Sequence, residues 1–204
     1  VVAQHAQEPR LTEGAQMNEG EVSAELGLTG WPAVAAEAII ARDVQIAEFT
    51  GGRYHACHIS TAESVDVIRW AKKRGVQVTA EVTPHHLLLD TPHVEGFDTT
   101  FKVNPPLRTS EHIEALREAL ADGTIDVVAT DHAPHAQQDK DHPFDVALPG
   151  MLGLEQSLAV VIDVMVNSGL MDWATLVERM STAPARIGRL AGQGRRLAVG
   201  EPAN

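Results

Sequence analysis

The feature that most constrains the fold of this chain is the alternation of short β-like segments with longer helical ones. The segments "VVAQH", "RYHACHIS", "VQVTAEVTP" and "TIDVVATDH" are short and apolar, and helical patterns separate them. This alternation is typical of a parallel sheet with crossover helices. A (β/α)8 barrel takes eight such units in about 250 residues. Because the 204 residues hold only about four units, the sequence predicts an α/β fold that is half of a barrel.

The helical segments carry their own start and stop signals. In residues 60–75, Ser60 and Glu63 fit a capping box and Gly75 supplies the stop. Residues 110–123 place apolar side chains on one side and end at a glycine. Further helices are predicted in "WPAVAAEAIIARDVQIAEFTGG", "GLEQSLAVVIDVMVNSG" and "DWATLVERMSTAP".

The ends of the chain and one long connection complete the predicted organisation. We expect residues 1–190 to form the half barrel and residues 191–204, which are rich in glycine, to begin a truncated C-terminal segment. The opening "VVAQHAQEP" has no initiator methionine and starts on an apolar strand-like segment, which is typical of an interior cut. The connection over residues 83–108 is longer than usual, so we expect it to carry function.

Charge and cysteine content narrow the classes of partner. The net charge is -12 and the sequence pI is about 5.2, which argues against nucleic acid or an anionic membrane surface as a partner because both select basic patches. Cys57 is the one cysteine, so no internal disulfide forms. No charged and apolar leader and no membrane-spanning apolar run is visible. We therefore expect a soluble protein of the cytoplasm.

Three of the four predicted strands end in a side chain that can bind a metal ion. His5 ends the first, His58 the second and Asp131 the fourth. In a barrel of this kind the chemistry lies at the carboxyl ends of the strands, so these side chains should converge. Strand parity places His55 and His58 on opposite sides, and we assign His58 to the mouth because it is nearer the strand end. Two imidazoles and a carboxylate are a zinc-type ligand set, incomplete for a binuclear site.

Structural roles remain open for the same residues. A lone histidine at a strand end is more often a hydrogen-bonded structural residue than a ligand. Asp131 is as well suited to be the N-cap of a helix that starts at the following residues. Cys57 reads as a small packing residue, since no electropositive neighbour marks it as reactive. His85 and His86 in "TPHHLLL" either line the mouth or stabilise a turn.

Five blocks of the sequence together resemble the class I dihydroorotases of the amidohydrolase superfamily. The blocks are "HACHISTAESVDVIRWAKKRG", "VTAEVTPHHLLL", "FKVNPPLR", "GTIDVVATDHAPH" and "LPGMLGLE", and the resemblance covers nearly the whole chain. It implies a partial TIM (β/α)8 barrel of the metal-dependent hydrolase type, made of roughly strands five to eight with their helices. It also implies a binuclear zinc centre, with His5 and His58 as ligands from the fifth and sixth strands. Asp131, at the eighth strand, would be both ligand and proton carrier.

The resemblance also assigns a substrate and the residues that bind it. It implies reversible hydrolysis of the cyclic amide of dihydroorotate to N-carbamoyl-aspartate, a step of pyrimidine synthesis. Asn104 and His135 would contact the substrate, and the backbone at Pro149 and Gly150 would close the pocket. The other members of the superfamily nearest to this pattern are hydantoinase or dihydropyrimidinase and allantoinase. A different alternative is a dihydroorotase-like scaffold without activity that associates with aspartate transcarbamoylase; a homodimer is also compatible.

The chain departs from the pattern of that family at several places. Family members usually read His-Cys-Glu-Asp where this chain has "HAQE" from His5 onward, so the ligand is kept while its neighbours differ. The His-x-His of the first strand and the bridging acidic group of the fourth strand lie outside the chain, and the sequence stops at "VGEPAN" before the closing strands of the family. We therefore expect half of a zinc site and little activity from the chain alone.

Overall fold

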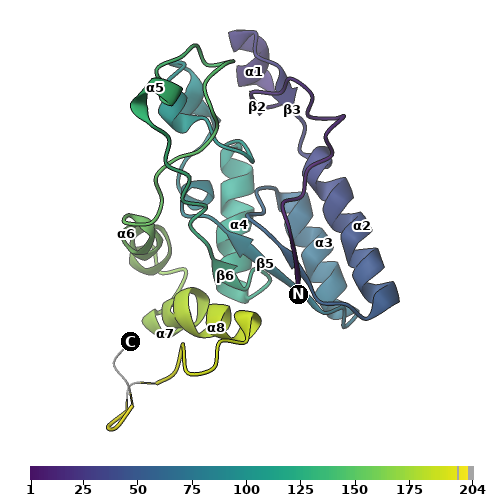
Figure 1. The fold of residues 1–204 in the computed structure, drawn as a ribbon, viewed down its shortest axis with the longest axis vertical. Helices are drawn as coiled ribbons and strands as arrows, with labels where there is room; N and C mark the ends of the chain where they lie inside the picture. The colour runs from purple at the N-terminus through teal and green to yellow at the C-terminus, as the bar shows by residue number, and fades with distance from the viewer. Residues whose placement is uncertain (197, 202–204) are drawn as a thin grey trace.

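The computed structural model describes residues 1–196 and 198–201 and is built around a four-stranded parallel sheet. The strands are β1 (Val2–Gln4), β4 (Tyr54–Ala56), β5 (Val78–Val82) and β6 (Val127–Val128), in the order β1-β4-β5-β6 (Figure 1). The predicted parallel α/β arrangement is confirmed. The proposed C-terminal segment, residues 191–204, includes positions 197 and 202–204, which lie outside the described residues, and its boundary stays a prediction.

Three long helices connect the strands and cover one face of the sheet. They are α2 (Val34–Thr50), α3 (Ala62–Lys73) and α4 (Ser110–Asp122), which lie side by side (Figure 1). The strand side chains that face them are small and fully buried, as at Ala56, Ala80 and Val82. The main hydrophobic core therefore lies between the helices and the sheet. Burial of each large apolar side chain in this layer contributes about 1.5–3 kcal/mol to the stability of the fold.

The opposite face of the same strands carries polar side chains. Side chains alternate along a strand, and paired residues of neighbouring strands share a face. His55 pairs with Thr79 in the β4-β5 register, so His55, Thr79 and Glu81 lie on the face turned away from the helices. The face that would line the inside of a barrel is therefore polar near the carboxyl ends of its strands.

The helix ends agree with the sequence at their C-termini and differ at one N-terminus. Helices α2 and α4 stop at glycines in the left-handed conformation, Gly51 and Gly123, as predicted. The predicted capping box of α3 is wrong. Thr61, not Ser60, is the N-cap, and its hydroxyl accepts a hydrogen bond from the Ser64 backbone N–H at 3.2 Å. Ser60 instead accepts from the guanidinium of Arg108.

A small module that the sequence did not reveal is inserted between β1 and α2. It consists of β2 (Met17–Asn18), α1 (Glu21–Leu26) and β3 (Gly30–Trp31), with the two strands parallel. The module lies beyond the carboxyl end of β1 (Figure 1). Arg108 anchors it, because this guanidinium, 1% exposed, donates to Asn18 Oδ1 at 2.7 Å and to the Trp31 carbonyl at 3.0 Å.

The remaining segments are irregular or short helices. The connection from β5 to α4 contains 3₁₀ turns at His85–Leu87, Thr91–Val94 and Thr99–Phe101. After β6 come α5 (Gln137–Lys140), α6 (Ser157–Val161) with its π-helical continuation Ile162–Asn167, α7 (Trp173–Val177) with its π-helical continuation Glu178–Thr182, and α8 (Ala183–Gly188). Within residues 1–196 and 198–201, no helix has both the length and the apolar character needed to cross a membrane.

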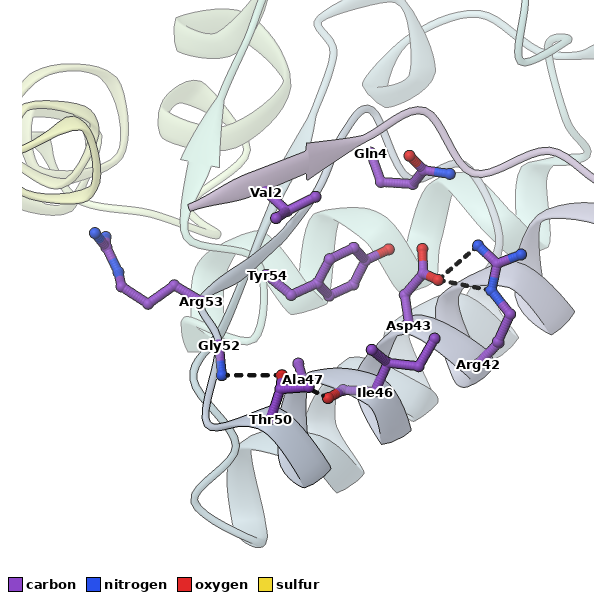
Figure 2. Close-up of a pocket in the computed structure, with 10 residues that line it drawn as sticks. All are labelled: Val2, Gln4, Arg42, Asp43, Ile46, Ala47, Thr50, Gly52, Arg53 and Tyr54. Atoms are coloured by element: carbon purple, nitrogen blue, oxygen red, sulfur yellow. Dashed lines mark hydrogen bonds and ion pairs between the residues drawn. The ribbon is translucent and has the colours of Figure 1, made fainter.

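Strand β1 is an edge of the sheet, and a cavity of about 270 Å³ opens between it and α2. Tyr54 lies between Val2 and the helix in this cavity, with the Arg42–Asp43 ion pair at one end (Figure 2). Burial raises the pKa of the Tyr54 hydroxyl, which has no hydrogen-bond partner among the described residues. The cavity is a gap beside an uncovered strand edge, and none of the predicted site residues lines it.

Candidate functional site

The imidazoles of His5 and His58 meet at the carboxyl ends of β1 and β4. His5 Nδ1 lies 3.0 Å from His58 Nε2, and the two rings are edge-on with centroids 4.7 Å apart. Burial, and then the proximity of His5, lower the pKa of His58, which favours the neutral ring. Neutral imidazole nitrogens are the form that binds metal ions, so this contact is a suitable place for a cation.

His58 reaches this position by a route that strand parity does not describe. Strand β4 ends at Ala56, and His58 adopts φ 32°, in the left-handed region. Its backbone N–H donates to Glu81 Oε1 at 3.1 Å. The parity argument that separated His55 from His58 does not apply, because His58 lies beyond the end of the strand. The structure nevertheless brings His58, and not His55, into contact with His5.

Asp131 lies near His58 on a strained turn after β6. The predicted strand through Asp131 is wrong at its end, because β6 stops at Val128 and Asp131 has φ 46°. Its carboxylate is close enough to act on His58, whose pKa its charge raises against the effect of burial. The N-cap alternative for Asp131 is also wrong, because the next helix, α5, begins at Gln137 with Ala136 as its cap.

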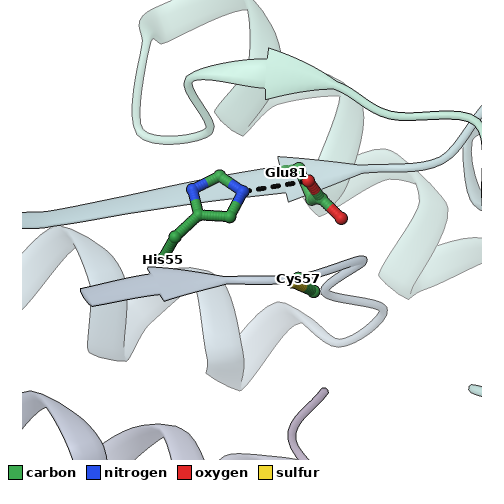
Figure 3. Close-up of side chains that lie close together, drawn as sticks. All are labelled: His55, Cys57 and Glu81. Carbon is green, nitrogen blue, oxygen red and sulfur yellow. Dashed lines mark hydrogen bonds and ion pairs between the residues drawn. The ribbon is translucent and has the colours of Figure 1, made fainter. Parts of the chain in front are cut away.

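A second group of side chains that could bind a metal ion lies next to the His58 backbone. Among the described residues, the ligand atoms of His55, Cys57 and Glu81 all lie within 4.8 Å of one another (Figure 3). His55 uses both ring nitrogens, with Nε2 2.9 Å from Glu81 Oε2 and Nδ1 2.7 Å from Thr79 Oγ1. Burial and then the Glu81 charge raise the pKa of the Cys57 thiol to about 11. The hydrogen bonds of this group hold Glu81 against the His58 backbone.

Glu81 is a functional candidate that reasoning from the sequence missed. Burial alone would raise its pKa, but the hydrogen bond and charge of His55 and the N–H of His58 outweigh burial, and the pKa is lowered. The ionised carboxylate is thus available to hold His58 in its left-handed backbone conformation. His55 and Cys57, at the end of one strand, are two residues apart, as are Thr79 and Glu81 on the next. This spacing was the signal that could have revealed the shared face.

The predicted substrate-binding residues lie around two neighbouring cavities. Asn104 and Pro149 line one of about 290 Å³, while His135 and Gly150 line another of about 470 Å³. The two are linked, because His135 Nε2 donates to the Pro149 carbonyl at 2.9 Å. A Cβ atom at Gly150, with φ 147°, would lie 2.7 Å from His135 Nε2, so only glycine permits this approach.

Gln7 joins the histidine pair to the substrate side. Its Oε1 accepts from His5 Nε2 at 2.8 Å and from Asn104 Nδ2 at 3.1 Å. Asn104 Oδ1 is buried without a hydrogen-bond partner among the described residues. The sequence marked Gln7 only as a departure from the family pattern, because the partner of a side-chain amide depends on segments far away in the chain.

The two histidines of "TPHH" differ in their contacts. His86 stabilises a turn, since its ring contacts Thr83 Oγ1 at 2.7 Å and the Pro105 carbonyl at 3.1 Å. His85 is buried, and neither of its ring nitrogens has a hydrogen-bond partner among the described residues. Burial and then the nearby His58 lower the pKa of His85 to about 4.

Comparison with known proteins gives a consistent result along the chain. A family model described as "Dihydro-orotase-like" matches residues 1–64. The dihydroorotases of Streptomyces coelicolor and Mycobacterium tuberculosis are 65% and 54% identical to the chain over 204 residues, which is 100% of the chain and 48% and 47% of those proteins. The chain therefore spans about half the length of the curated relatives it matches.

Solved structures that resemble the chain include hydantoinases (dihydropyrimidinases). The L-hydantoinase (dihydropyrimidinase) of Arthrobacter aurescens superposes with a TM-score of 0.85 and 29% identity, over 98% of the chain and 46% of that protein. A D-hydantoinase (dihydropyrimidinase) from Thermus sp. gives 0.83 and 26% over the same shares. Identity is more than twice as high to the dihydroorotases of Streptomyces coelicolor and Leifsonia xyli, at 65% and 64% over the whole chain. By this similarity the chain corresponds to about half of a protein of the dihydroorotase family.

Proposed function

We propose that the full-length protein is a dihydroorotase that reversibly hydrolyses the cyclic amide of dihydroorotate to N-carbamoyl-aspartate. The observation that carries this proposal is the 3.0 Å contact between His5 and His58 at the carboxyl ends of adjacent strands, with the Asp131 charge acting on the same imidazole. Identities of 54–65% to dihydroorotases over the whole chain support the choice of substrate.

The proposed cofactor is zinc, with two ions in a complete site and the remaining ligands outside this chain. His5, His58 and Asp131 fit the group, because two imidazoles and one carboxylate are the nitrogen and oxygen donors that zinc prefers. His58 is largely withdrawn from water, which strengthens its interaction with a cation. When bound, zinc polarises an amide carbonyl and lowers the pKa of water.

The protein side chains transfer the proton and orient the substrate. Asp131 accepts a proton from the attacking water and passes it to the ring nitrogen as the amide bond breaks. Asn104 and His135 orient the substrate by hydrogen bonds, and the Pro149 and Gly150 backbone closes the pocket around it. The cavities lined by these residues adjoin each other, which supports a shared pocket.

Substrate comparison tests the proposal. The purified full-length protein, loaded with zinc, is assayed with dihydroorotate, dihydrouracil, hydantoin and allantoin. We expect turnover of dihydroorotate, which carries a carboxylate that the other ring substrates lack. Preferred turnover of hydantoin or dihydrouracil would make the protein a hydantoinase or dihydropyrimidinase, and preferred turnover of allantoin an allantoinase.

A protein that binds aspartate transcarbamoylase and turns over none of these substrates would be a scaffold. Three further properties of the full-length protein remain predictions: a homodimer, an association with aspartate transcarbamoylase, and a location in the cytoplasm. Size-exclusion chromatography with and without the transcarbamoylase tests the first two.

A further inference from the structure

The side-chain oxygen of Gln7 is a hydrogen-bond acceptor shared by the metal side and the substrate side of the site. Its side-chain oxygen accepts from His5 Nε2 at 2.8 Å and from Asn104 Nδ2 at 3.1 Å, while its Nε2 donates to Thr12 Oγ1 at 2.7 Å. Three of the four hydrogen-bonding positions of the amide, both acceptor positions and one donor, are therefore used.

The direction of these bonds follows from Thr12. The Thr12 hydroxyl has one proton, and its contact with the Glu8 carbonyl at 3.2 Å requires that proton because a carbonyl only accepts. Thr12 must then accept from Gln7, which places the Gln7 amide nitrogen toward Thr12 and the oxygen toward His5.

The orientation of Gln7 determines the tautomer of His5. An oxygen 2.8 Å from His5 Nε2 requires a proton on that nitrogen. The neutral ring then carries its lone pair on Nδ1, the atom 3.0 Å from His58 Nε2. A metal ion at this contact meets a ready lone pair on His5 with no change of tautomer, which is the effect of a hydrogen-bonding partner behind a histidine ligand.

The same orientation fixes the amide of Asn104. Because its Nδ2 is given to Gln7, Oδ1 remains as a buried acceptor without a partner among the described residues, beside the cavity that Gln7 and Asn104 both line. An unpaired buried acceptor favours a ligand that donates a hydrogen bond. Resting here on the proposed function, that donor is an N–H of the cyclic amide.

We propose that Gln7 is a positioning residue that couples the two halves of the site: it holds His5 with Nδ1 free for the metal ion and holds Asn104 with Oδ1 free for the substrate. One amide thus sets the protonation pattern of a ligand and the polarity of a substrate contact.

The test compares Gln7→Met with Gln7→Glu in the full-length protein, with the exposed helix residue changed in Gln45→Met as the matched control. Methionine has a similar length but no strong acceptor, whereas glutamate keeps the acceptor. Zinc affinity is measured by competition with a chromophoric chelator. We expect Gln7→Met to weaken zinc binding about 10- to 100-fold, and Gln7→Glu and Gln45→Met to stay within a few-fold of the parent.

The tautomer is read separately by ¹⁵N NMR of the imidazoles in the zinc-free protein. His5 should carry its proton on Nε2 in the parent and in Gln7→Glu, and a mixture of tautomers should appear in Gln7→Met. If Gln7→Met does not fold, Thr12→Val, which removes the acceptor that holds the amide, should weaken zinc binding in the same direction by a smaller factor.

Two outcomes overturn the proposal. One is unchanged zinc affinity and tautomer in the apolar variant. The other is a Gln7→Glu variant as impaired as Gln7→Met, which would mean that the donor end of the amide is what matters. Neither measurement uses dihydroorotate, so a protein that hydrolyses a different ring would fail the substrate comparison and still pass this test. With dihydroorotate and saturating zinc, Gln7→Met should raise KM more than it lowers kcat, through Asn104.

Discussion

His58 depends on its neighbours for a backbone conformation that histidine seldom adopts. Its φ of 32° is in the region where a side chain crowds the backbone, at a cost of about 1–2 kcal/mol. The hydrogen bond from its N–H to Glu81, and the His55 ring that keeps Glu81 ionised, offset that cost. Local strain at this residue is thus a sign of a site whose surroundings hold it in place.

This arrangement predicts different consequences for the two histidines of "HACH". His58→Ala should release zinc and abolish turnover together, because it removes a nitrogen from the proposed metal site. His55→Ala should mainly lower the free energy of unfolding, by about 1–3 kcal/mol, because it leaves Glu81 buried without its partner. Metal analysis and denaturant unfolding of both variants, with His142→Ala at an exposed position as control, check this. If His55→Ala lost zinc and His58→Ala kept it, the two assignments would be reversed.

Asp131 should act on the transition state more than on binding. We expect Asp131→Asn to lower kcat by about 100- to 10,000-fold, the usual contribution of general acid-base catalysis, with little change in KM. His135→Ala should instead raise KM, since His135 is proposed to hold the substrate. Both are measured with the zinc content of each variant. Near-normal kcat in Asp131→Asn with zinc retained would remove Asp131 from the role of proton carrier.

The buried ring of His85 predicts a dependence of stability on pH. Its pKa is 6.5 in the unfolded chain and about 4 in the folded protein, so between these values the unfolded state binds more protons. Stability must therefore fall as the pH is lowered from about 6.5 to 4, by about 3 kcal/mol from this group. His85→Leu should reduce the pH dependence of unfolding in this window, and His142→Leu should not. Equal slopes in the parent and His85→Leu would contradict a buried neutral ring.

At the scale of the elements, the N-terminus of α3 offers a direct comparison between the predicted and the observed cap. Thr61→Ala should cost about 1 kcal/mol of stability, because Thr61 satisfies the Ser64 N–H and is fully buried. Glu63→Ala, at the position of the predicted capping box, should change stability by less than about 0.5 kcal/mol since Glu63 is 62% exposed. Urea unfolding of both variants distinguishes them, and a larger loss for Glu63→Ala would restore the predicted capping box.

The helices and strands were predictable where their signals are local. Glycine stops helped to place both α2 and α4, and apolar side chains three or four residues apart marked the buried face of α4. The module of β2, α1 and β3 was missed, since strands of two residues are too short to show a period. Strand β6 is likewise two residues long, and the turn after it, not the strand, carries Asp131.

The site was predictable to the extent that strand ends converge. The rule that strand ends converge predicted that His5 and His58, 53 residues apart in the sequence, lie close together. It did not reveal Glu81 or Gln7, because both act through hydrogen bonds to groups whose positions depend on the folded backbone. The left-handed conformation of His58 was not predicted either. Histidine adopts it more often than most residues other than glycine, but most histidines do not, so the residue type alone does not mark the position.

At the scale of the whole molecule, the sheet has an uncovered edge at β1. Val2 on β1 is 68% exposed, and Phe49 on the neighbouring helix α2 is 91% exposed. Unpaired strand edges with apolar side chains favour association. We expect the 204-residue chain on its own to self-associate with rising concentration, and Val2→Lys to reduce this association. Sedimentation velocity over a range of concentrations measures it, and a monomer at all concentrations would contradict the expectation.

The same chain should have little or no dihydroorotase activity by itself. The family resemblance places the His-x-His ligands and the bridging acidic group outside this sequence, so His5, His58 and Asp131 make up only part of the proposed zinc site. Turnover of dihydroorotate by the purified chain with added zinc checks this. Substantial zinc-dependent turnover would show that the residues of this chain suffice.

The strand order β1-β4-β5-β6 follows the order of the chain, and this has a consequence for recombination between related genes. If two related genes recombine in a loop between consecutive strand-helix units, the two strands on either side of that loop come from different parents. Every other pair of neighbouring strands comes from a single parent. His5 and His58 follow the two strands of one such pair, β1 and β4, whereas Asp131 and His135 both follow β6. A chimera joined between α4 and β6 would therefore inherit its imidazole pair and Asn104 from one parent, and Asp131 and His135 from the other.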